Sequence, residues 1–165
     1  MGFVGYLGAE GVIKNLALGK DCSVTGSVGY VGGLCGRNEG SISNCCNGAT
    51  VTGENGSTYV GGICGQNMGG RITNCYNTGD ITGDIIVGGV CGSSYNDGII
   101  TNCYWLDTSA SAGVSGDSSE VTKKTARQFA SGEVTYLLNG GNTQSPVWRQ
   151  NVDQGTKDAL PVLDS

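Results

Sequence analysis

The sequence lacks histidine altogether and is poor in proline, aromatic and charged residues. Its 165 residues contain no His, 2 Pro, 2 Trp and 2 Phe, and only 14% are Asp, Glu, Lys or Arg. Without His the chain loses the commonest general base, the commonest zinc ligand and the usual pH-sensitive side chain. Any catalytic site would therefore have to use carboxylate, Cys, Ser, Tyr or Lys groups.

Long apolar runs and clustered positive charge are missing as well. No stretch of about 18 apolar residues occurs, so we expect no membrane-spanning segment. The formal net charge is −5 and the 9 Lys and Arg are scattered, so nucleic acid, which requires a basic surface, is not expected as a partner. Residues 1–20 lack the order of charged and apolar regions of an export signal. We therefore expect a monomeric segment of a larger chain, with any signal outside it.

Glycine is abundant, and one phrase of the sequence recurs. The chain has 31 Gly, which suits short strands joined by tight turns. YVGGLCGRNEGSISNC, from residue 30, returns as YVGGICGQNMGGRITNC from residue 59 and as VGGVCGSSYNDGIITNC from residue 87. A looser copy occupies residues 2–26. The spacing is 29 residues from Cys35 to Cys64 and 27 from Cys64 to Cys91, and periods of this length are typical of repeat architectures.

The pattern inside one period predicts the fold. We count three β-prone pieces, V-G-G-[LIV]-C-G, I-x-N-C and x-[VI]-T-G, separated by turn residues. If each period is one coil, like strands stack about 4.8 Å apart. The sequence therefore predicts an all-β, right-handed parallel β-solenoid of about four coils. A β-sandwich would not require the same residue types at the same phase of every copy, whereas a solenoid does.

Asparagine and cysteine recur in columns, which we expect to form structural ladders. The predicted ladder positions are Asn15, Asn44, Asn74 and Asn102, together with Cys35, Cys64 and Cys91 and with Cys45, Cys75 and Cys103. Ile42 and Asn44 are two residues apart, so we expect them on one side of a strand. The Asn column has two open interpretations: amides stacked from coil to coil, or turn residues that bond their own backbone.

The cysteine columns favour packing over chemistry. In the first copy these columns hold Val4 and Leu16. Both positions therefore require an apolar side chain of modest size, which a reduced Cys provides. A disulfide between adjacent coils stays open as an alternative. Zinc is disfavoured because no close C-x2-4-C pair occurs. One difficulty remains at Leu34 and Cys35: strict alternation cannot bury both, so either the chain turns between them or one column faces a partner.

The pattern changes near residue 117, which divides the chain into a repeat region, 1–116, and a C-terminal capping segment, 117–165. Thr125 and Gln128 have the spacing of a helix capping box. Apolar residues at helical spacing follow, and Gly132 should divide them into two short helices. Trp148 and the final Leu-Pro-Val-Leu suggest an apolar clamp and a last strand. We expect this segment to cover the end of the stack, where a solenoid otherwise exposes apolar surface and strand edges.

The repeats resemble the GLUG motif. The residues that carry the resemblance are G-G-[LI]-C-G-x-N-x-G-x-I-x-N-C-[CY]-x-x-G-x-[VI]-T-G, as in residues 32–53 and 61–83. That motif occurs in bacterial surface proteins and beside the catalytic domains of some immunoglobulin-A-cleaving metallopeptidases. The resemblance implies a β-solenoid and a secreted or cell-surface location in a bacterium. It does not imply peptidase activity, because the zinc-binding H-E-x-x-H is absent.

These observations favour a non-catalytic structural or adhesive module of an exported bacterial surface protein. A host protein or a glycan is the candidate ligand, and no catalytic residue, metal ligand or cofactor is predicted. One alternative is a polysaccharide-active β-helix enzyme, with Asp80, Asp84 and Asp97 around one corner and Arg37 and Arg71 around another. Others are an accessory substrate-binding region of a surface peptidase, and ice or mineral binding by Ser/Thr columns. Calcium at the Asp-rich turns would need six or more converging oxygens.

Overall fold

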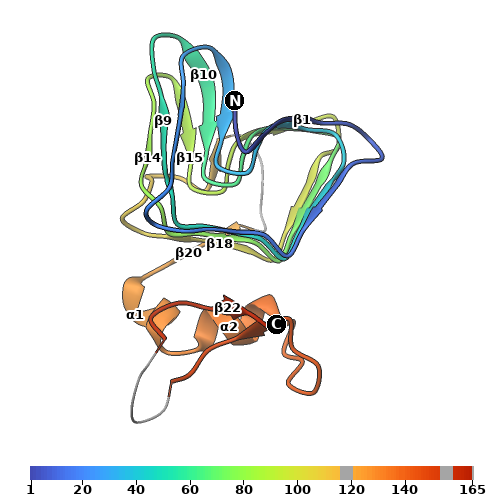
Figure 1. Ribbon diagram of the computed structural model, residues 1–165, viewed down its shortest axis with the longest axis vertical. Coiled ribbons are helices and arrows are strands. Elements are labelled where there is room, and N and C mark those ends of the chain that lie inside the picture. Colours follow the sequence, from blue (N-terminus) through green and yellow to red (C-terminus); the bar gives the residue numbers. More distant parts are fainter. Residues whose placement is uncertain (116–120, 153–157, 165) are drawn as a thin grey trace.

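The chain stacks its repeats into a parallel β-solenoid (Figure 1). The computed structural model describes residues 1–115, 121–152 and 158–164. Short strands follow one another around each coil, and each strand pairs in parallel with its counterpart in the next coil. The predicted all-β parallel solenoid of about four coils is confirmed, while its right-handed sense stays a prediction. No helix of the described part is long and apolar enough to cross a membrane.

A complete coil has five short strands rather than the three that we counted in the sequence. The strands form five parallel sheets, which we name A to E. Sheet A contains β1 (Val4–Leu7), β6 (Cys35–Asn38), β11 (Cys64–Met68), β16 (Cys91–Tyr95) and β19 (Val114–Ser115). Sheet B contains β2 (Val12–Lys14), β7 (Ser41–Ser43), β12 (Arg71–Thr73) and β17 (Ile99–Thr101). Sheet C contains β3 (Ala17–Leu18), β8 (Cys46–Asn47), β13 (Tyr76–Asn77), β18 (Cys103–Leu106) and β20 (Val121–Lys124). Sheet D contains β4 (Ser23–Gly26), β9 (Thr50–Gly53) and β14 (Ile81–Thr82), and sheet E contains β5 (Gly29–Gly32), β10 (Ser57–Gly61) and β15 (Ile86–Gly88).

The extra corners divide two of the expected pieces. Strand β5 ends at Gly32 and β6 begins at Cys35, so the chain bends between them. Both Leu34 and Cys35 are fully buried, and their backbone N–H groups donate to the same Ile63 carbonyl, at 3.0 and 3.1 Å. The turn resolves the alternation problem, because strict alternation applies only within a strand.

Glycine is required where sheets E and A meet. A Cβ atom on Gly61 would lie 2.1 Å from the Cys64 carbonyl oxygen and 2.6 Å from the Gly92 nitrogen. Real Cβ atoms do not approach backbone so closely, so any side chain would force the two sheets apart. The V-G-G motif thus encodes a backbone-to-backbone contact.

The interior consists of two apolar clusters. The larger fills the space between sheets A, B and C with aliphatic residues and the cysteine columns, and includes Leu34, Ile63 and Val90. The smaller joins sheets D and E through Val31, Val51, Val60 and Ile81. Side chains of one kind stack directly: Cys64 pairs with Cys35 and Cys91, and Ile72 pairs with Ile42 and Ile100.

The C-terminal segment contains two short helices, α1 (Ala126–Ala130) and α2 (Glu133–Leu138), and an antiparallel pair, β21 (Trp148–Arg149) with β22 (Val162–Leu163). The capping box is present: the Thr125 hydroxyl accepts from the Gln128 backbone, and the Gln128 side chain accepts from the Thr125 backbone. Gly132, with φ of 85°, separates the helices. The predicted boundary between residues 116 and 117 lies outside the described residues.

The C-terminal segment lies along the side of the solenoid, against sheet C, as Figure 1 shows. Phe129 and Trp148 pack on Tyr76, with ring centroids 5.6 and 5.3 Å apart. The Tyr76 hydroxyl donates to the Pro161 carbonyl at 2.6 Å. The same cluster includes Cys46 and Tyr104 from the neighbouring coils. Within the predicted capping segment, β20 extends the end of sheet C by pairing with β18, while the helices and β21–β22 cover the apolar column on the outer face of that sheet. The expected cover over the end of the whole stack stays a prediction.

Candidate functional site

The predicted asparagine column forms a ladder at the outer corner between sheets B and C. Asn44 Nδ2 donates to Asn15 Oδ1 at 3.3 Å, Asn74 to Asn44 at 3.2 Å, and Asn102 to Asn74 at 2.7 Å. All four residues have φ between 52° and 54°, the left-handed turn conformation in which Asn is favoured. The column therefore consists of amides stacked from coil to coil, carried by residues in a left-handed turn conformation. Placing Asn44 on the same side as Ile42 was wrong, because the left-handed residue turns its side chain outward while Ile42 is buried.

Two further polar ladders are built on fully buried asparagines, and our sequence analysis missed them. Asn47 Nδ2 donates to Asn77 Oδ1 at 2.8 Å, and Asn77 Nδ2 donates to Ser109 Oγ at 3.2 Å. On another corner, Asn38 donates to Asn67 at 2.8 Å, and Asn67 to Ser94 at 3.2 Å. The signal was available, because these asparagines recur at the same period as the cysteines.

All eight cysteines are free thiols. The six column cysteines, Cys35, Cys64, Cys91, Cys45, Cys75 and Cys103, have no exposed surface. Each Sγ donates to a backbone carbonyl two residues away, as Cys75 does to Thr73 at 3.1 Å. Burial raises the pKa of the Cys64 and Cys75 thiols, which disfavours the thiolate that nucleophilic or metal chemistry requires.

The acidic residues of the enzyme alternative do not share one corner. Asp80 precedes β14 and Asp84 follows it, and both are exposed. Asp97 lies in the turn between β16 and β17, at the corner where Arg71 begins β12 and pairs with Ile99. Among residues 1–115, 121–152 and 158–164, no group of three or more Cys, Asp or Glu side chains could hold a metal ion.

Four tyrosines line the outer side of sheets A and E, and we call them the tyrosine row: Tyr6, Tyr30, Tyr59 and Tyr95. Tyr30 stacks on Tyr59 with centroids 5.6 Å apart, and Tyr59 meets Tyr95 edge-on at 6.1 Å. The Tyr6 ring lies 5.9 Å from the Arg37 guanidinium. Tyr30 and Tyr59 therefore cover part of each other, and Arg37 lies over the Tyr6 ring.

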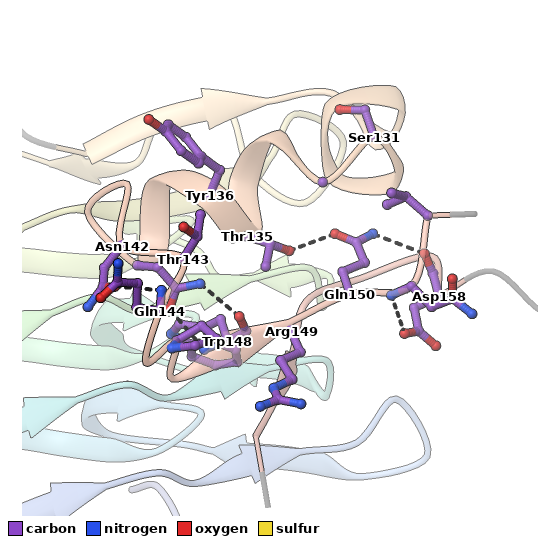
Figure 2. A pocket seen from close by; sticks show the side chains of 15 residues that line it. Ser131, Thr135, Tyr136, Asn142, Thr143, Gln144, Trp148, Arg149, Gln150 and Asp158 are labelled. Atoms are coloured by element: carbon purple, nitrogen blue, oxygen red, sulfur yellow. Dashed lines mark hydrogen bonds between the residues drawn. The ribbon is translucent and has the colours of Figure 1, made fainter.

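The C-terminal segment encloses an open pocket of about 770 Å³, which we call the C-terminal pocket (Figure 2). Tyr136 of α2, Asn142 and Gln144 of the following loop, Trp148 of β21, Gln150 and Asp158 are among its lining residues. Figure 2 shows Gln150 and Asp158 beside the helix and Trp148, Asn142 and Gln144 near its other end, while Tyr136 projects away from Gln150 and Asp158.

Hydrogen bonds fix the walls of the C-terminal pocket. Gln150 accepts from Thr135 Oγ1 at 2.7 Å and donates to the Phe129 and Asp158 carbonyls at 2.8 and 2.9 Å. Asn139 Nδ2 donates to the Trp148 carbonyl at 2.7 Å, and its Oδ1 accepts from the Val147 and Trp148 backbone at 2.9 Å. These amides join α2 to the extended chain and hold the opening in one shape.

The charged side chains in the described lining of the C-terminal pocket have partners, whereas one buried hydrogen-bond donor has none. Arg149 Nε lies 2.9 Å from Asp164 Oδ1, and Asp158 Oδ2 accepts from the Asn151 backbone at 2.8 Å. Trp148 is 1% exposed, and its Nε1–H has no partner among the described residues. Our sequence analysis took Trp148 only as an apolar clamp. The overlooked signal was the five Asn and Gln side chains within residues 139–151.

Comparisons with known proteins agree with the repeat and the fold. Residues 56–82 match the family model described as the GLUG motif. A suspected immunoglobulin A1 protease from Bacteroides ovatus, with a crystal structure at 1.30 Å resolution, is similar to this chain with a TM-score of 0.59 and 24% identity. The likeness covers 96% of this chain but only 61% of that one, so it extends to the fold alone. No curated protein matches the sequence. The chain thus carries the GLUG motif, as its sequence predicted, within a parallel β-solenoid.

Proposed function

We propose that this chain is a non-catalytic structural and adhesive module of an exported bacterial surface protein. The observation that carries the proposal is the set of polar ladders, which link each coil to the next through side chains as well as backbone. Contacts of this kind are local along one axis, so the stack is a stiff element whose length grows by about 4.8 Å per coil. A stiff spacer that holds a binding surface away from a cell fits such a design.

The adhesive part of the proposal is supported by the surfaces on the side of the stack. The C-terminal pocket opens to solvent, while the cysteine columns are closed to it. The candidate ligand is a host protein or a glycan, and the net charge of −5 argues against nucleic acid.

Two assays test this function together: binding to mucin-coated surfaces tests adhesion, and incubation with soluble polysaccharides tests for catalysis. We expect the purified chain to bind the coated surface and to release no reducing ends or unsaturated sugar products from the polysaccharides. Turnover that disappears when Asp80 and Asp84 are both changed to Asn would instead favour the enzyme alternative.

A second candidate is an accessory substrate-binding region of a surface peptidase. It is favoured by the likeness to the Bacteroides ovatus protein, which spans nearly the whole of this chain. Binding of the purified chain to immunoglobulin A1, but not to mucin glycans, would support this candidate over the first.

A further inference from the structure

The C-terminal pocket has the size of a small-molecule site. Ligand sites in proteins are concave and occupy roughly 300–1,000 Å³, and this pocket has about 770 Å³. It is wide open, so it suits a ligand that is one end or one stretch of a longer molecule.

The lining combines apolar surfaces with neutral amides. Tyr136, Pro146 and Val152 supply apolar area, and Asn and Gln side chains supply polar groups. An amide both donates and accepts hydrogen bonds, as a sugar hydroxyl does, so the two groups can pair in either sense. Aromatic rings offer a flat apolar face to the C–H side of a pyranose ring.

The electrostatics favour a neutral ligand. Within the described lining, the charged residues Arg149 and Asp158 are both engaged, Arg149 with Asp164 and Asp158 with the Asn151 backbone. A site for an acidic sugar or a phosphate would instead present uncompensated cations. Among the lining residues that the structure describes, no such cation is present.

Some groups of the lining remain available after the internal hydrogen bonds are made. Asn142 uses its Oδ1 to accept from the Gln144 and Ser145 backbone at 2.9 and 3.4 Å, which leaves its Nδ2 donor. Tyr136 is 58% exposed, and within the described residues no ring stacks on it. The Trp148 Nε1–H has no acceptor among the described residues, but it is buried in the wall and is not open to a ligand.

The tyrosine row is the rival surface, and it is less suited to sugars. Tyr30 and Tyr59 lie nearly parallel, 24° apart, and cover part of each other's faces. Tyr6 is occupied by Arg37, and its hydroxyl donates to Glu39 at 2.8 Å. A pyranose ring needs an unoccupied aromatic face, which Tyr136 provides.

We propose that the C-terminal pocket binds a neutral saccharide, with Tyr136 as the stacking surface and Asn142 as a hydroxyl partner. This inference rests on the proposed adhesive function and names its site and ligand class. The GLUG coils then act as the stalk, and the C-terminal segment on their side carries the recognition.

The test combines direct binding with adhesion. Methyl glycosides of galactose, mannose, glucose and N-acetylglucosamine are titrated into the full chain by calorimetry and saturation-transfer NMR, with sialic acid and glucosamine as charged counterparts. We expect at least one neutral glycoside to bind and both charged sugars to bind more weakly. Tyr136→Ala and Asn142→Ala should each weaken binding at least tenfold, while Tyr95→Ala on the tyrosine row should leave it unchanged. Thermal melting of each variant verifies that it is folded.

The outcomes separate this inference from the function on which it rests. Binding to mucin that the neutral glycoside inhibits and that Tyr136→Ala abolishes supports both. Binding to mucin that is indifferent to Tyr136→Ala, or that only Tyr95→Ala removes, overturns the pocket as the site and leaves adhesion standing. Absence of binding to every sugar and to mucin overturns both.

Discussion

Replacement of one buried asparagine should reveal how strongly the internal ladders hold the coils together. Asn77 is fully buried in β13 and takes part in four hydrogen bonds. Its Oδ1 accepts from Asn47 Nδ2 at 2.8 Å and from the Gly79 backbone at 3.3 Å. Its Nδ2 donates to the Gly79 carbonyl at 2.9 Å and to Ser109 Oγ at 3.2 Å. The substitution Asn77→Ala removes all four hydrogen bonds. Because the side chain is fully buried, solvent water does not reach the groups that lose their partners.

The magnitude follows from the groups left behind. The Asn47 amide and the Gly79 carbonyl each lose a partner in a closed space, and a buried polar group without a partner costs about 1–3 kcal/mol. We therefore expect Asn77→Ala to lower the free energy of unfolding by about 2–5 kcal/mol. The matched control is Asn74→Gly in the outer ladder, which preserves the left-handed turn and exposes the freed groups to water. That variant should lose only about 1 kcal/mol.

Urea denaturation followed by circular dichroism measures both variants against the parent chain. The reasoning predicts a clear order, with the parent most stable, Asn74→Gly slightly weaker and Asn77→Ala much weaker. Equal losses for the two variants, or a loss for Asn77→Ala below about 1 kcal/mol, would refute the claim that the buried amides are tightly coupled between coils.

Three other perturbations follow from the same structure. Gly61→Ala should destabilise the fold by about 3 kcal/mol, because its Cβ would lie 2.1 Å from a backbone oxygen, whereas Gly19→Ala, with open space around it, should be neutral by the same urea titration. A thiol reagent should modify only the exposed Cys22 quickly in the native chain and all eight cysteines in denaturant; fewer than eight would indicate disulfides. Alkaline pH should destabilise the protein, because burial raises the pKa of Cys46 to about 11 and raises that of Tyr76 as well. A group with a raised folded-state pKa contributes stability below its unfolded pKa and loses it as the pH rises. Unfolding midpoints should therefore fall from about pH 9 upward, and Tyr76→Phe should reduce that fall.

The stacking of coils could be predicted from the letters because a solenoid places each repeat against its own copies. Ile42, Ile72 and Ile100 recur at one phase of the sequence and pair directly in sheet B. The same logic would have located the buried ladders of Asn38 with Asn67 and of Asn47 with Asn77. They were missed because the prediction used only the Asn residues that directly precede a column Cys, and these form the outer ladder.

The corners could not be predicted, because they depend on single backbone conformations. Alternation fails at Asn44, whose left-handed φ of 53° rotates the side chain outward. It fails again between Gly32 and Cys35, where the chain bends. Both departures lie within pieces that read as continuous strands in the sequence.

The C-terminal helices were visible in the sequence, but their position was not. The capping box and the helical spacing are local signals, and both helices are present. Their position depends on the outward column of Cys46, Tyr76 and Tyr104, which becomes an apolar surface only after the coils have stacked. The C-terminal pocket has the same origin, since it arises from tertiary hydrogen bonds of Asn139 and Gln150.

The central claim is that like residues of successive repeats lie in direct contact. NMR on the intact chain, with labelled isoleucine methyls and asparagine side chains, tests it most directly. The account predicts nuclear Overhauser effects from Ile42 to Ile72 and from Ile72 to Ile100, and between the side-chain amides of Asn47 and Asn77. Assigned spectra in which these pairs show no contact, or in which Ile42 contacts other strands instead, would contradict it.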